Sequence, residues 1–314
     1  LGLHHSKKYG TVPDCMKKTE CNQQGIKYTP PNDNNGHNVN VAISQIYSWF
    51  LFSVLVIGCL RVFPMYIGNF TIDIALFLKL LTHGWMFLCV LGCTSCLRAS
   101  HRYEGLPKFF IEWHILVKND VLSFDLTKIR KTTIIVTVMG WSFLVSNVLF
   151  STYLVVFDQQ YIAPAFTPFP MEGDYLIITQ IVIIILLSLN AASWFFPMAL
   201  DTVVCMALYL QFETFNKEFR QKCKHDGSFT GNIGDERIKH QKICKLVGHA
   251  DDFLSLYKAS SFGCNIVLVI CIIYIVIYDT ELGESVLALG IYVFWFMMGI
   301  SFLLITSISG ILVN

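Results

Sequence analysis

Several polar side chains interrupt long apolar stretches of the sequence, and these are the groups most able to do chemistry. They are Lys79, His83, Asn147, Gln180, Asn190, Asp201 and Asn265. Polar groups inside a membrane are costly, so they indicate a functional contact by default. Lys79 and Asp201 are the most costly because they carry a charge. Lys79 lies close enough to the outer rim to snorkel outward, whereas Asp201 either makes a structural hydrogen bond or takes part in gating.

Motifs for catalysis or metal binding have little support. No nucleophile elbow, HExxH, P-loop or GxGxxG pattern occurs in the sequence. The segment Cys93-Thr94-Ser95-Cys96 has the cysteine spacing of half a zinc site. It lies inside an apolar run with no second pair nearby, so the cysteines are predicted to be packing residues. We therefore expect no enzyme activity, no metal and no cofactor.

The composition is that of a membrane protein. The 314 residues are 54% hydrophobic and 14% charged, whereas a soluble domain has about 25% charged residues. Mean hydropathy is +0.55. The net charge of +1 offers no basic surplus to neutralise a phosphate backbone. A soluble enzyme and a nucleic-acid-binding protein are therefore disfavoured, and the lipid bilayer is the expected surrounding.

Six apolar runs are long enough to cross a membrane as helices, which need roughly 20 apolar residues. They cover residues 41–63, 72–97, 133–157, 175–212, 259–278 and 285–313. The fold class predicted from them is all-α, a polytopic membrane helix bundle. The fourth run is too long for one straight crossing and has Pro197 in its middle, so it forms either one long helix or a hairpin of two.

The distribution of Lys and Arg predicts the orientation, because these residues accumulate on the cytoplasmic side. They occur in the tail 1–40 and in the segments 98–132 and 213–258, and they are missing from 64–71, 158–174 and 279–284. This alternation requires the run 175–212 to cross once, with the tail 1–40 in the cytoplasm. We therefore expect a multi-pass protein of the plasma membrane.

The segments predicted to lie outside contain one glycosylation sequon and no cysteine. The sequon is Asn69-Phe70-Thr71, and its closeness to the membrane counts against a glycan at Asn69. None of the 11 cysteines falls in an outer loop, so we expect no structural disulfide.

The region 213–258 is predicted to continue the long helices into the cytoplasm as an anchor. Asp235 is a plausible N-cap for a helix that runs to Tyr278. Apolar residues at spacings of three and four form one face of this helix between Ile243 and Tyr257. That face either packs against the chain's own fourth run or, in addition, joins subunits through Leu246, Phe253 and Tyr257.

Two shorter segments are also informative. The segment 108–124 mixes aromatic and charged residues and is predicted to be an interfacial amphipathic helix. The loop 158–174 holds three prolines together with Phe166 and Phe169. A loop this stiff and aromatic either caps a pocket or lies as a plain surface loop.

The layout resembles the invertebrate gustatory and odorant receptors and their gustatory-receptor-like relatives over about residues 40–314. The best local likeness runs from Arg237 to Phe262-Gly263, where a pattern of residue types leads into the fifth apolar run: His240, Ile243, Leu246, His249, Phe253 and Leu254. The resemblance implies seven helices with a cytoplasmic N-terminus, of which six are in this chain. The family's Thr-Tyr and Gln-Phe signature belongs to the seventh helix and is not in the 314 residues.

The resemblance also implies a function. Members of this family are ligand-gated cation channels that assemble as tetramers around a pore lined by the seventh helix, so a homotetramer and a small-molecule ligand are expected. Their ligands sit in the outer half of the bundle. Transferred to this chain by depth, such a pocket is lined by Phe77, Lys79, Asn147, Phe150, Tyr153, Gln180, Tyr292 and Trp295. Lys79 would favour an anionic or polar ligand.

Another class of polytopic receptor or a transporter is the alternative. A G-protein-coupled receptor would explain His101-Arg102-Tyr103 if a helix preceded the first run, but the Cys-Trp-x-Pro and Asn-Pro-x-x-Tyr motifs do not occur. A transporter would be favoured by internal repeats with broken helices, and the two halves of the sequence show no convincing similarity.

Overall fold

The computed structural model describes residues 36–66, 72–101, 105–118, 126–169, 173, 175–223 and 228–313. Within these residues the regular elements are helices, and no β-strand occurs. The long ones are α2 (Gly36–Leu60), α3 (Ile74–His101), α5 (Leu126–Phe157), α6 (Leu176–Lys222), α7 (Ile233–Tyr278) and α9 (Val286–Val313). The short ones are η2 (Phe63–Tyr66), α4 (Leu106–Lys118), η3 (Gln159–Phe166) and α8 (Thr280–Glu284). The predicted all-α class is therefore confirmed.

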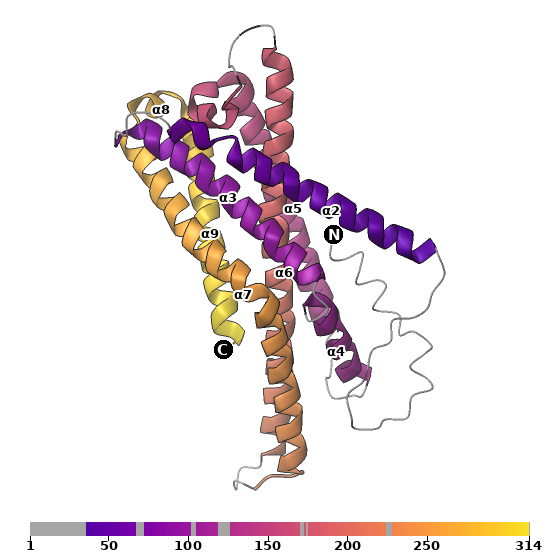
Figure 1. Cartoon of the computed structure of the whole chain (residues 1–314). Helices are drawn as coiled ribbons and strands as arrows, with labels where there is room; N and C mark the ends of the chain where they lie inside the picture. The colour runs from indigo at the N-terminus through magenta and orange to yellow at the C-terminus, as the bar shows by residue number, and fades with distance from the viewer. Residues whose placement is uncertain are drawn as a thin grey trace.

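Six of the described helices are long and apolar enough to span a membrane, the pattern of a multi-pass membrane protein. Helices α3, α6, α7 and α9 pack around one another, and α5 packs along α6. Helix α2 leans obliquely across the outside of α3 (Figure 1). Its exposed side chains include Trp49, Phe50 and Ile57, which is the composition of a lipid-facing surface.

Helices α6 and α7 are much longer than a membrane crossing. They have 47 and 46 residues, which corresponds to about 70 Å at 1.5 Å per residue, against a hydrocarbon core of about 30 Å. Together they form a hairpin that extends far beyond the end of α9 (Figure 1). We call the hairpin from Val204 to Phe253 the extension.

Helix α6 continues through Pro197 without a break. A proline has no N–H group, so it leaves the carbonyl oxygen four residues earlier, on Ser193, without its helical donor. Gly92 of α3 lies against this oxygen, and a Cβ atom at Gly92 would be 2.9 Å from it. Helix α3 thus approaches α6 closely at the carbonyl group that Pro197 leaves without its helical hydrogen bond.

The tip of the extension is fixed by a cap and by ion pairs. Asn232, and not Asp235, is the N-cap of α7, because its side chain accepts a hydrogen bond from the N–H of Gly234 at 2.9 Å. The preceding Gly231 has a φ of 155°, which favours glycine. Lys222 of α6 pairs with Glu236 of α7, and Lys239 pairs with Glu218 at 2.5 Å.

The segment predicted to be an amphipathic helix forms helix α4, and part of its apolar face packs on the extension. Phe109 and Leu116 are buried with Phe253 of α7 in one apolar cluster. On the polar side, Glu112 pairs with Lys245 at 2.9 Å and with His249 at 3.2 Å. Glu112 of α4 thus meets partners on α7, and the apolar residue Phe109 packs against Phe253 of the same helix.

Candidate functional site

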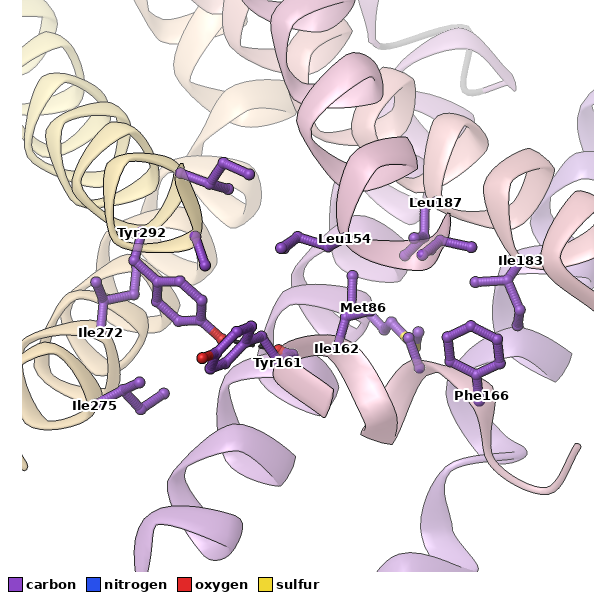
Figure 2. Packing of buried hydrophobic residues seen from close by; sticks show 14 of the residues in the cluster. Met86, Leu154, Tyr161, Ile162, Phe166, Ile183, Leu187, Ile272, Ile275 and Tyr292 are labelled. Atoms are coloured by element: carbon purple, nitrogen blue, oxygen red, sulfur yellow. Dashed lines mark hydrogen bonds between the residues drawn. The ribbon is translucent and has the colours of Figure 1, made fainter. Parts of the chain in front are cut away.

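The loop after α5 folds inward and covers the end of the bundle. Its helix η3 buries Tyr161, Ile162, Pro164, Ala165 and Phe166. The hydroxyl of Tyr292 in α9 donates a hydrogen bond to the carbonyl oxygen of Tyr161 at 2.9 Å, and Figure 2 shows the two rings side by side. The sequence allowed this loop to be a cap over a pocket or a plain surface loop, and the structure supports the cap.

Arg61, near the end of α2, holds the cap from the other side. Its guanidinium group donates to the carbonyl oxygens of Thr167 and Ala165, the latter at 2.5 Å. It also lies over the ring of Phe169, 5.7 Å from the ring centre, within the range of a cation–π contact. Arg61 is thus a basic residue at the end of the bundle predicted to lie outside, and its partners are backbone dipoles of the cap.

A cavity of about 70 Å³ lies beneath the cap. One water needs roughly 10–15 Å³ on this measure, so the space suits a small organic molecule. Its wall is formed by η3 and by α3, α5, α6, α7 and α9. The lining residues are Leu81, Thr82, Trp85, Asn147, Ser151, Tyr161, Ile162, Ala165, Leu187, Trp194, Asn265, Leu268, Val269, Ile272, Tyr292, Trp295 and Gly299.

The structure places some of the predicted pocket residues in the cavity wall and the others away from it. Asn147, Tyr292 and Trp295 line the cavity. Phe77 stacks on Tyr274, with the ring centres 3.7 Å apart, and Phe150 meets Phe294 edge-on at 4.9 Å. These two phenylalanines are outside the lining.

The three remaining predicted residues are also away from the cavity. The side-chain amide of Gln180 donates to the carbonyl oxygen of Val155 at 3.2 Å, so it joins α6 to α5. The ring of Tyr153 lies 5.3 Å from that of Phe157 one turn later. Lys79 is half-buried on α3 and does not line the cavity.

The prediction omitted the contribution of α7 and of two tryptophans. Asn265 and Leu268 of α7, together with Trp194 of α6 and Trp85 of α3, line the cavity. The sequence signal was present in part, because Asn265 is a polar residue in an apolar run. The sequence gives no signal for which residues of each helix face the cavity, because that depends on how all the helices pack together.

The predicted subunit-contact residues are buried within the chain. Leu246 is 1% exposed, Phe253 5% and Tyr257 2%. Leu246 and Phe253 lie in the apolar cluster of the extension, and Tyr257 packs near Trp194. The structure thus gives them the first of the two predicted roles, packing within one chain. Asn69, the sequon residue, lies outside the described residues.

A buried ion pair lies below the cavity, between α6 and α7. The carboxylate of Asp201 is 3.4 Å from Nζ of Lys258, and the two side chains are 2% and 22% exposed. The Sγ atom of Cys205 lies 3.3 Å from the same Nζ and 3.5 Å from the Asp201 oxygen. Asp201 therefore has a structural partner that the sequence left unidentified.

Comparison with protein-family models, with curated proteins and with solved structures finds no match for this chain. Among the described residues, no group of three or more His, Cys, Asp or Glu side chains could hold a metal ion. The capped cavity is therefore the feature that supports a functional inference.

Proposed function

We propose that the protein is a membrane receptor that binds a small molecule in the cavity beneath η3. The observation that carries this proposal is a mostly apolar cavity between the helices with a few polar groups in its wall, which is the usual form of a small-molecule site. The wall includes Asn147, Ser151 and Asn265 among apolar and aromatic side chains. A purely structural bundle would fill such a space with side chains.

Within this class, we propose a chemoreceptor-like subunit of a ligand-gated cation channel in the plasma membrane. The resemblance to gustatory and odorant receptors supports it, as does the long extension formed by α6 and α7. The homotetramer that this class implies would have to use exposed surfaces, because Leu246, Phe253 and Tyr257 are covered within the chain. Exposed candidates on the extension are Phe219 and Ile238.

The proposed orientation places the cap outside and the tip of the extension in the cytoplasm. Cys223 and Cys244 lie on the extension and are exposed, so they serve as native reporters. We expect a membrane-impermeant maleimide to leave both unlabelled in intact cells and to label them after permeabilisation. The matched control is Gln160→Cys, at an exposed position of the cap, which should be labelled in intact cells. Labelling of Cys223 or Cys244 in intact cells would show that the extension lies outside the cell and would contradict the proposed orientation.

Gating is tested by whole-cell recording with a ligand screen and ion substitution. We expect a cation current that persists when G-protein signalling is blocked. Trp295→Ala removes a wall of the cavity and should raise the half-maximal ligand concentration about tenfold or more, because a buried aromatic contact is worth at least about 1.4 kcal/mol. The side chain of Gln180 donates a hydrogen bond to Val155, away from the cavity. Gln180→Ala should therefore leave the half-maximal concentration unchanged at equal surface expression.

The other receptor classes give different results in the same recording. A current abolished by blocking G proteins would indicate a G-protein-coupled receptor. A ligand-dependent current that saturates with substrate and reverses with its gradient would indicate a transporter. An equal effect of Trp295→Ala and Gln180→Ala would place the ligand elsewhere in the molecule.

A further inference from the structure

Among the described residues, the wall of the cavity contains no charged side chain. The polar residues in it are Thr82, Asn147, Ser151, Asn265 and the aromatic residues with N–H or O–H groups. Lys79, the charge expected there, is not part of the wall. An ion taken from water into such a site would lose its hydration without gaining a counter-ion, which is costly. An uncharged ligand therefore fits this wall better than the anionic one that Lys79 suggested.

Two indole N–H groups of lining residues lack an acceptor in the part of the chain that the structure describes. The Nε1 atoms of Trp194 and Trp295 are buried and have no hydrogen-bond partner among the described residues. Their rings are held by neighbours: Trp194 stacks on Phe302 at 4.3 Å, and Trp295 meets Tyr292 edge-on at 5.3 Å. An indole N–H is a donor only, and a buried donor normally has an acceptor. Both tryptophans are among the residues that line the cavity.

One acceptor of a lining residue has no donor among the residues that the structure describes. The side-chain amide of Asn265 is 1% exposed, and its Nδ2 donates to the carbonyl oxygen and hydroxyl of Ser261 at 2.8 and 3.1 Å. Those bonds fix the amide, and its Oδ1 has no donor within the described part of the chain. The lining residues thus include two unpaired donors and one unpaired acceptor within the described part of the chain, and a hydroxyl group, which both accepts and donates, has the chemistry to satisfy them.

We propose that the cavity selects an uncharged, mostly hydrocarbon molecule of small-ring size that carries a hydroxyl group. The hydroxyl oxygen accepts from the indole N–H groups of Trp194 and Trp295, and its proton is donated to Oδ1 of Asn265. The rest of the molecule packs against apolar residues such as Leu187 and Ile272. This inference rests on the proposed receptor function and specifies the chemistry of its ligand.

The test compares three compounds with the same seven-carbon skeleton: benzyl alcohol, toluene and benzoate. Saturable binding to the full chain in nanodiscs is measured by equilibrium dialysis of radiolabelled compound, with empty nanodiscs as background. We expect benzyl alcohol to bind about fivefold or more tightly than toluene, because only the alcohol satisfies the unpaired groups. Benzoate should show no saturable binding.

Matched variants link the preference to the two indoles. Trp194→Phe and Trp295→Phe keep an aromatic ring and remove the N–H, so each should weaken benzyl alcohol about fivefold and leave toluene unchanged. Trp141→Phe is the control, because Trp141 is 53% exposed on α5 and lies outside the wall. Each variant's melting temperature is measured to confirm that it folds.

Two results would overturn this inference, and they differ in what they say about the receptor. Equal affinity for toluene and benzyl alcohol, with both tryptophan variants unaffected, would show that the cavity binds small molecules without selecting a hydroxyl, and the proposed function would stand. No saturable binding of any of the three compounds, together with an unchanged half-maximal concentration for Trp295→Ala in recordings, would overturn both proposals.

Discussion

Replacing Lys258 by methionine is expected to lower the free energy of unfolding by about 3–5 kcal/mol. The substitution removes the ammonium group that pairs with the Asp201 carboxylate, and the Asp201 side chain is only 2% exposed. The ammonium group that is lost lies 3.4 Å from the carboxylate. The cost is large because a charge taken from water needs a nearby counter-charge. Unfolding by sodium dodecyl sulfate titration, followed by circular dichroism, measures the change.

The reverse substitution and the double variant provide the controls. Asp201→Asn should cost less, because the Lys258 side chain is 22% exposed and can turn its ammonium group toward solvent. The pair Asp201→Leu with Lys258→Met should recover most of the loss, since replacing both members of a buried pair is often neutral. Lys242→Met, at an exposed position of α7, should change little. A double variant that is less stable than Lys258→Met would contradict the pairing.

Gly92→Ala is expected to destabilise the protein by about 1–3 kcal/mol. The added Cβ atom would lie 2.9 Å from the Ser193 oxygen and 3.4 Å from Cγ of Pro197. Both contacts are with rigid groups, so α3 must move away from α6 to admit the methyl group. The melting temperature of the purified protein in detergent should fall accordingly.

Gly140→Ala is the matched control for this substitution. Gly140 lies in α5, and a Cβ atom there meets nothing within 4 Å. Alanine favours a helix over glycine by roughly 0.5–1 kcal/mol, so this variant should be slightly more stable than the wild type. The two substitutions are chemically identical, so opposite signs would isolate the contact at Ser193. Equal shifts would show that the α3–α6 contact is looser than the structure has it.

Much of the local structure followed from the sequence, because helix formation in apolar runs depends on neighbouring residues. The run 175–212 forms part of the single helix α6 from Leu176 onward, despite Pro197, as the distribution of charges required. The stiffness of the loop 158–174 left a cap and a plain surface loop open, and the structure decided for the cap, with Tyr161 and Phe166 buried in η3. The start of α7 was displaced by three residues, since Asn232 caps the helix in place of Asp235.

The site was less predictable, because depth in the membrane does not give rotation about a helix axis. Successive residues of a helix point about 100° apart. Gln180 lies at a plausible depth, but its side chain faces Val155 of α5. Trp295 and Tyr292 are three residues apart on α9 and share one face, and both line the cavity. Choosing residues by their depth in the membrane therefore identified cavity residues only where the chosen helix face was the one that faces the cavity.

The amino-acid sequence by itself determined the helices, their approximate ends and the polar residues within them, since these depend on composition, spacing and local hydrogen bonding. Only the tertiary structure decided which polar groups meet. It paired Asp201 with Lys258 and placed Arg61 on the cap. Within the described part of the chain it left the Nε1 atoms of Trp194 and Trp295 and Oδ1 of Asn265, three lining residues of one cavity, without a hydrogen-bond partner. These encounters join residues far apart in the chain, and they are set by how the faces of all the helices pack at once.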